Sequence, residues 1–207
     1  SNQTPQRSVY AELCRSLRDD YTMVGNASKN GATCFQLNKT GIALDCNGNW
    51  IVGNDSSGAR GVRASSLNNV SVRECFVKDF TRGIEFFKVN NGVLVNNTVL
   101  SNTDGMFLSQ SSGVSASDNV LKNNDNYGIT LSASQANVSY NKALNNSVAV
   151  IQTENTNFTT IAFNLVDGNK YEGILVYNYS SFNNVSYNTI NNNTNYGITF
   201  SKYASNN

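Results

Sequence analysis

Histidine is absent from this chain of 207 residues. Without an imidazole, the chain has no histidine general base and no histidine ligand for zinc or copper. Charged side chains make up only 14% of the residues and the net charge is +1, so neither nucleic acid nor an anionic membrane is expected as a partner. No apolar run approaches the ~20 residues of a membrane span, and direct membrane insertion is therefore not expected.

The motifs of common active sites are missing as well. The chain has no phosphate loop, no Ser-centred elbow and no Cys/His pair. Asp104 and Asp125 are expected at the same turn of successive repeats, and Glu74 and Asp118 on either side of Asn96. Paired acids in turns are more often solvated or structural than catalytic, although a close pair could do glycosidase chemistry. We expect no catalytic residue, no metal site, no cofactor and no enzymatic activity.

Asparagine, by contrast, is abundant at 36 residues, and a glycine recurs at nearly constant spacing. Each recurring glycine precedes an aliphatic residue or Met, and Ala149-Val150 fills the one gap, so that the steps run 22, 22, 23, 21, 24 and 24 residues. Repeats of this length predict a solenoid with one coil per repeat, whereas a disordered polar segment would not keep the phase. The glycines are Gly61, Gly83, Gly105, Gly128, Gly173 and Gly197.

Each repeat contains three short segments of strand character. After the glycine, residues alternate as in Ile84-Glu-Phe86, so the first and third side chains should point inward. A second segment ends before a recurring asparagine, as in Val138-Ser-Tyr140, and a third apolar position follows it, as in Val120 and Leu165. Three strands and three bends in about 22 residues predict an all-β parallel β-helix, because the Leu-dense consensus of leucine-rich repeats is absent.

The recurring asparagines predict stacked ladders. One set lies 13 to 15 residues after each glycine, and a second set follows five residues later, from Asn102 to Asn193. Asn tolerates the left-handed conformation, and its amide can bond the equivalent Asn in the coils above and below. The alternative is that these residues only cap surface turns. The predicted structural ladder is Asn97, Asn119, Asn141, Asn164 and Asn188.

Two features predict an extracellular or cell-surface location. The four cysteines favour disulfides Cys14–Cys34, pinning the N-terminal segment to the first coil, and Cys46–Cys75 between adjacent coils; buried free thiols are the alternative. The chain also contains twelve Asn-x-Ser/Thr sequons, several of which are expected to face the core or a tight turn. These glycosylation candidates are Asn2, Asn26, Asn38, Asn54, Asn69, Asn96, Asn137, Asn145, Asn157, Asn178, Asn184 and Asn192.

The segment 34–53, which contains Leu44-Asp-Cys-Asn-Gly48, resembles the opening coil of pectin-lyase-like surface proteins of the archaeal exported type. Their repeats are similar to those of carbohydrate-binding and sugar-hydrolase domains, and the resemblance covers roughly residues 14 to 203. It implies a right-handed parallel β-helix of about 7–8 coils of 21–24 residues. Family hydrolases that act on pectin use clustered aspartates with a Gly-His-Gly element, which this chain lacks. The fold hosts many functions, so the resemblance does not fix one.

The ends suggest an assembly. Residues 1–33 are expected to form an arm and cap, with a short helix near 10–18, and residues 34–207 the β-helix. The last strand, which contains Ile198 and Phe200, has the pattern of an interior coil and no cap, so a second copy is expected to cover it, contacted by Val9 and Leu13. The alternative is a fragment of a longer solenoid. The leading hypothesis is a glycosylated structural subunit that stacks head-to-tail into a filament or stalk.

The second functional hypothesis is a domain that binds or processes carbohydrate and has glycans as partners. It rests on Phe87, Phe107 and Tyr177, which should point outward and could stack on sugar rings. Ile151 and Leu175 are also expected to point outward and favour a protein partner instead.

Overall fold

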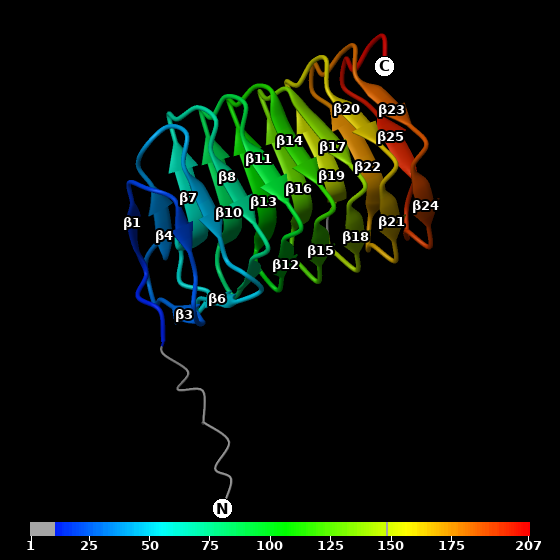
Figure 1. Cartoon of the computed structure of the whole chain (residues 1–207). Helices are drawn as coiled ribbons and strands as arrows, with labels where there is room; N and C mark the ends of the chain where they lie inside the picture. Colours follow the sequence, from blue (N-terminus) through cyan, green and yellow to red (C-terminus); the bar gives the residue numbers. More distant parts are fainter. Residues whose placement is uncertain (1–10, 148) are drawn as a thin grey trace, which may run out of the picture.

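Three parallel sheets wrap around one apolar core, and successive coils stack along a single axis (Figure 1). The computed structural model describes residues 11–147 and 149–207. Each coil adds one strand to each sheet in turn, and the two ends of the described chain lie at opposite ends of the stack. The solenoid has about eight coils, as the repeat predicted.

Sheet 1 contains nine strands, and its longer members follow the recurring glycine positions. They are β1 (Arg15–Leu17), β4 (Phe35–Leu37), β7 (Arg60–Ser65), β10 (Arg82–Phe87), β13 (Asp104–Ser109), β16 (Tyr127–Ser132), β19 (Ala149–Glu154), β22 (Glu172–Tyr177) and β25 (Ile198–Phe200).

Sheets 2 and 3 contain eight strands each. Sheet 2 consists of β2 (Tyr21–Thr22), β5 (Ala43–Asp45), β8 (Ser71–Arg73), β11 (Val93–Val95), β14 (Val114–Ser117), β17 (Ala136–Ser139), β20 (Thr160–Ala162) and β23 (Asn184–Ser186). Sheet 3 consists of β3 (Ala27–Ser28), β6 (Trp50–Val52), β9 (Phe76–Lys78), β12 (Thr98–Leu100), β15 (Val120–Lys122), β18 (Lys142–Leu144), β21 (Leu165–Asp167) and β24 (Thr189–Asn191).

Turns join the sheets in a fixed order within each coil. Turn 1 connects sheet 1 to sheet 2, turn 2 connects sheet 2 to sheet 3, and turn 3 leads to sheet 1 of the next coil. No helix occurs in residues 11–147 and 149–207, and this part of the chain therefore contains no helix long and apolar enough to cross a membrane.

The core is filled by aliphatic residues at equivalent positions of successive coils. In sheet 1 the inward rows include Ile84, Met106 and Ile129, which are paired in register and fully buried. Alternation along a strand sends the residues between them outward. Charged residues of neighbouring strands are aligned with each other in the same register, since Arg82 is paired with Asp104 and Arg63 with Glu85.

One predicted side-chain direction is wrong. Ile151 is aligned with Ile129 and is fully buried, because the alternation in β19 begins one residue later than expected; a slip of one residue exchanges the two faces of a strand. Sheet 3 buries Leu121 and Val166, so the neighbouring Val120 and Leu165 are not core residues.

The N-terminal segment is part of the solenoid and not a separate cap. β1, β2 and β3 pair with β4, β5 and β6, so residues 15–28 form the first coil and the boundary expected at residue 34 falls inside the β-helix. The helix expected near residues 10–18 is not formed, since Arg15–Leu17 is a strand. Glu12 stabilises this end of the solenoid, because its carboxylate accepts hydrogen bonds from the Tyr21 hydroxyl at 2.5 Å and the Val24 N–H at 2.9 Å.

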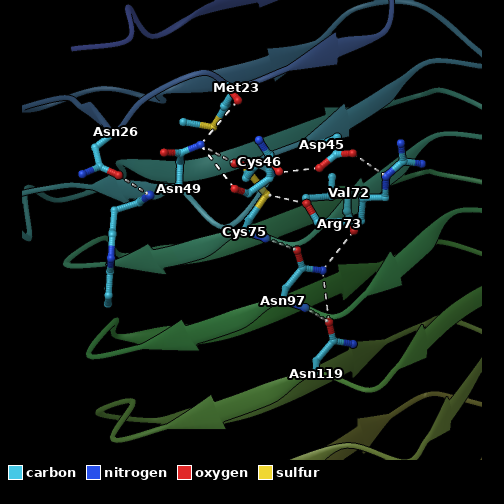
Figure 2. The surroundings of a disulfide bond; sticks show 12 residues. Met23, Asn26, Asp45, Cys46, Asn49, Val72, Arg73, Cys75, Asn97 and Asn119 are labelled. Atoms are coloured by element: carbon cyan, nitrogen blue, oxygen red, sulfur yellow. Dashed lines mark hydrogen bonds and ion pairs between the residues drawn. A yellow bond between two sulfur atoms is a disulfide. The ribbon is translucent and has the colours of Figure 1, made fainter. Parts of the chain in front are cut away.

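One disulfide and an asparagine ladder occupy the same turn 2 in different coils (Figure 2). Cys46 is bonded to Cys75 in this turn with Cα atoms 4.7 Å apart, whereas Cys14 is bonded to Cys34 directly before the sheet-1 strands β1 and β4. The ladder continues from Cys75, whose N–H donates to Asn97 Oδ1 at 3.1 Å. Along the ladder each Nδ2 donates to the Oδ1 of the next asparagine at 2.9–3.0 Å, from Asn97 to Asn188. The second ladder, in turn 3, is bonded in the same way.

Candidate functional site

Three aromatic rings form an exposed stack in turn 2. Tyr140 and Phe163 have ring centroids 5.2 Å apart at an interplanar angle of 6°, and Phe163 and Tyr187 are 5.0 Å apart at 4°. The three side chains are 57%, 47% and 78% exposed. Each residue has a φ of 54° to 59° and comes directly before a ladder asparagine. This left-handed turn residue bends the chain, so the ring points outward although it follows an alternating strand segment whose core-facing residue lies two positions earlier.

Two shorter stacks lie in turn 1, on the other side of sheet 2. Phe158 and Phe182 are 5.4 Å apart at 7°, and Tyr179 and Tyr203 are 5.0 Å apart at 13°. These four rings are also more than half exposed. Solvent-exposed aromatic patches on a soluble protein mark contact sites, so the two turns frame a candidate binding surface.

Between these stacks, the outer face of sheet 2 is narrow, polar and uncharged from β14 onward. Register aligns two outward rows, which consist of Ser115, Asn137, Thr160 and Asn184, and of Ser117, Ser139, Ala162 and Ser186. In the second row Ser139 and Ala162 are buried, so the first row supplies most of the accessible polar groups. Hydroxyl and amide groups both donate and accept hydrogen bonds, which suits a ligand rich in hydroxyl groups. We call this strip, with the turn-1 and turn-2 stacks at its edges, the aromatic-edged face.

The outward aromatics that the sequence singled out lie on sheet 1 and are less available. The Arg82 guanidinium lies 3.6 Å from the centre of the Phe107 ring and covers it, and Lys88 lies 5.1 Å from that of Phe87. Phe87, Phe107 and Tyr177 are all only partly exposed. The rings in the turns are instead the exposed ones, and the sequence signal for them is the polar character of Asn96 and Asp118 at the same turn position in earlier coils.

Glu85 and Asp104 of sheet 1 form ion pairs with arginine side chains. The Glu85 carboxylate is bonded to Arg60, to Arg82 at 3.0 Å and to Arg63 at 3.3 Å. Burial alone would raise the pKa of Glu85, but the hydrogen bonds from Arg60 and Arg82 outweigh it and lower this pKa below its ordinary value. Burial raises the pKa of Asp104, against a hydrogen bond from Asn126 and the charge of Arg82.

Of the acids that the sequence singled out, Asp104 and Asp125 do not interact, whereas Glu74 and Asp118 come directly after strands that are aligned on either side of the strand before Asn96, as predicted. In the next coil it is Asn126, not Asp125, that hydrogen-bonds Asp104, and Asp125 is exposed. Glu74 and Asp118 occupy exposed turn positions at φ values of 54° and 57°.

The remaining predicted residues lie on the surface. Of the sequon asparagines, Asn2 lies outside the described residues; Asn178 is half-buried and the other ten are exposed, so none of the described ones faces the core. Leu13 is 73% exposed at one end of sheet 1, and Ile198 and Phe200 are 42% and 47% exposed in the strand at the other end. Val9 lies outside the described residues.

Comparison with known proteins identifies a family over nearly the whole chain. The model of the family described as periplasmic copper-binding protein (NosD) matches residues 2–207. No curated protein sequence matches the chain. A periplasmic alginate epimerase, AlgG, as its T265N mutant, has a similar structure: the TM-score is 0.63 at 16% identity over 86% of this chain and 49% of that one. The Azotobacter vinelandii mannuronan C-5 epimerase AlgE6 A-module gives 0.53 at 15% identity, over 89% and 60%.

The expectation that the chain has no enzymatic activity is corrected by these structures. Both solved relatives in fold are epimerases that act on carbohydrate, and the chain spans about half of the first and 60% of the second. The fold of this chain is therefore one that carbohydrate-active enzymes also have. At 15–16% identity the likeness establishes the parallel β-helix itself, and it assigns no reaction to this chain.

The residues present do not fit the copper ion in the family's description. Copper sites in proteins use histidine, cysteine thiolate or methionine. This chain has no histidine, all four cysteines are in disulfides, and Met23 and Met106 are fully buried in the core. In residues 11–147 and 149–207, no three His, Cys, Asp or Glu side chains are grouped to hold a metal.

We expect this chain to bind no copper tightly. Equilibrium dialysis against Cu(I) or Cu(II), with a competing chelator, should leave well under one copper per chain, because no soft or imidazole donor is accessible. One tightly held copper per chain would contradict the expectation and would require a site of backbone and oxygen ligands.

Proposed function

We propose that this chain, which belongs to the NosD family of periplasmic proteins, binds a polysaccharide on its aromatic-edged face. The observation that carries the proposal is the pairing of exposed aromatic stacks with an uncharged strip of hydroxyl and amide groups. A sugar ring offers C–H groups on its faces and hydroxyls at its rim. Aromatic rings suit the first, and Ser, Thr and Asn side chains suit the second.

The scaffold keeps this face rigid. Strands β14, β17, β20 and β23 are hydrogen-bonded to each other, and the buried Asn119, Asn141 and Asn164 fix turn 2 directly beside the rings. A preformed surface loses little conformational entropy on binding, which favours affinity. The stacks also hold each other in place, since every ring in them has an aromatic neighbour within 5.4 Å.

The compartment is consistent with such a ligand. The family is described as periplasmic, and two disulfides form and persist in an oxidising compartment outside the cytoplasm. A location on the cell surface itself and glycosylation of the exposed sequons stay predictions.

We expect removal of the rings to abolish polysaccharide binding. The triple variant Tyr140→Ser, Phe158→Ser and Phe182→Ser removes rings from both edges of the face, and retention in gels containing polysaccharide should fall at least about tenfold, as for loss of interface hot spots. The substituted rings are exposed, so the variant should keep its β-rich circular dichroism.

A matched control is available in turn 3. Tyr171 is 48% exposed and lies away from the aromatic-edged face, between β21 and β22, so Tyr171→Ser should leave retention unchanged. A wild-type protein that no polysaccharide retards, or an equal loss in both variants, would contradict the proposal.

Head-to-tail stacking of copies is a second candidate. It is favoured by the half-exposed apolar side chains of Ile198 and Phe200 on β25, at the opposite end of the solenoid from Leu13. An end-to-end contact of this kind would not close on itself and would extend into a filament. Sedimentation over a concentration series tests it, because a mass that stays at one chain would remove this candidate.

A further inference from the structure

Two shallow depressions lie next to each other along turn 1, beside the ring of Phe158. One has a volume of about 290 Å³ and the other about 260 Å³, and both are lined by Gln135. The first also includes Phe158, Ser115, Asn137 and Thr160, and the second Gln110, Ser112, Asn155 and Asn157. We call the two together the turn-1 trough.

A glycine lines the first depression and adds no side chain to it. Gly113 comes directly before Val114 and Gln135 directly before Ala136, and Val114 and Ala136 are aligned in successive coils. Gly113 has a φ of +64°, and a Cβ there would lie 2.5 Å from Asn91 Oδ1, so this position favours glycine. The Gln135 amide turns toward the Phe158 carbonyl oxygen, to which it donates at 3.4 Å.

The Phe158 ring lines the trough and is 64% exposed. One of its faces is stacked on Phe182, at 5.4 Å between ring centroids and 7° between planes. Phe163 differs, because it is stacked on both sides, on Tyr140 and on Tyr187. A ring that is stacked on both sides cannot offer a face to a sugar, whereas Phe158 can.

The trough contains no ionisable side chain. Its lining consists of hydroxyl, amide and apolar groups together with the Phe158 ring. A carboxylate or sulfate on a ligand would therefore meet no lysine or arginine in the lining. No ion pair would offset the free-energy cost of removing water from its charge. Primary amides donate and accept at once, which matches the hydroxyl groups of a neutral sugar.

We propose that the turn-1 trough is a subsite for neutral hexopyranose residues, one of which stacks on the free face of Phe158. The inference rests on the proposed function and narrows it to a substrate class and a position. The hydroxyl groups of the stacked sugar are within the region lined by Ser115, Asn137 and Gln135, and the chain continues along the trough toward Asn155.

The test uses the full chain made without N-glycosylation, since Asn137 and Asn157 line the trough and are sequon residues. Calorimetry with neutral gluco-, manno- and galacto-configured hexasaccharides and with a hexauronate compares wild type with Phe158→Ala and with Tyr171→Ala as matched control, because Tyr171 is exposed in turn 3 outside the aromatic-edged face. Phe158→Ala should weaken binding of a neutral hexasaccharide about tenfold, and Tyr171→Ala less than about twofold. Both rings are exposed, so both variants should melt at nearly the wild-type temperature.

Each other outcome has a definite meaning. Preference for the hexauronate, or equal affinity of Phe158→Ala and wild type, overturns the trough as the subsite while binding on the aromatic-edged face stands. A wild-type protein that binds none of the hexasaccharides and is not retarded by any polysaccharide overturns the proposed function, and the subsite with it.

Discussion

Replacing Asn119 with alanine is expected to destabilise the solenoid by roughly 3–5 kcal/mol. Asn119 Oδ1 accepts from the Asn97 N–H at 2.9 Å and from Asn97 Nδ2 at 3.0 Å, and its Nδ2 donates to Leu94 O at 2.9 Å and to Asn141 Oδ1 at 3.0 Å. All four bonds join buried groups, and each contributes about 0.5–1.5 kcal/mol. Asn97 Nδ2 keeps its bond to Val72 O and Asn141 Oδ1 keeps the bond from the N–H of residue 119, whereas the Asn97 N–H loses its partner at a further cost of about 1–3 kcal/mol. Urea denaturation followed by circular dichroism measures the effect.

The matched control is an asparagine of the adjoining strand. Asn137 is exposed on β17, so Asn137→Ala should change the free energy of unfolding by less than about 0.5 kcal/mol. Equal midpoints for the two variants would show that the buried ladder contributes no more than a surface asparagine.

The second large effect is expected from Gly105→Ala. A Cβ at this position would lie 2.4 Å from the Gly128 carbonyl oxygen and 3.0 Å from Asn124 Nδ2. The backbone of the neighbouring coil cannot move aside without breaking sheet 1, and Asn124 is bonded within the turn-3 ladder. We expect a loss of about 3 kcal/mol or more, from overpacking and from the displaced ladder together.

Gly197 provides the comparison for this substitution. It occupies the equivalent position before the last strand of sheet 1, but the nearest atom to a Cβ there is Ile190 Cγ2 at 3.4 Å, an ordinary contact. Gly197→Ala should therefore be nearly neutral in thermal melts. A Gly105→Ala protein as stable as Gly197→Ala would mean that the coils are spaced more loosely than the structure has them.

The fold could be predicted because its determinants recur. Each coil needs a glycine where the backbones crowd, as at Gly105, and an asparagine in the ladder, as at Asn119. Because each requirement recurs every 22 to 24 residues, both appear in the sequence as a repeat. The register failed only where that signal is missing. Residues 149–151 are three consecutive apolar residues, and the recurring glycine is missing there. Alternation alone therefore allows two registers that differ by one residue. The observed register aligns Ile151 with Ile129.

The candidate site was harder to predict, for a physical reason. Tyr140, Phe163 and Tyr187 each follow an alternating strand segment, but each adopts a φ between 54° and 59° that ends the strand and turns the ring outward. Aromatic residues seldom adopt this conformation, so propensity does not reveal it. Comparison of equivalent turn positions does, because Asn96 and Asp118 could not face an apolar core at the same place.

The most direct test of the account is footprinting of the protein with a photoactivated carbene, with and without a bound polysaccharide. Binding on the aromatic-edged face predicts reduced labelling of Tyr140, Phe158 and Asn137, and unchanged labelling of Phe87 on sheet 1. Reduced labelling on the outer face of sheet 1, with sheet 2 and its turns unaffected, would contradict the account and would place the ligand beside Glu85 and Asp104 instead.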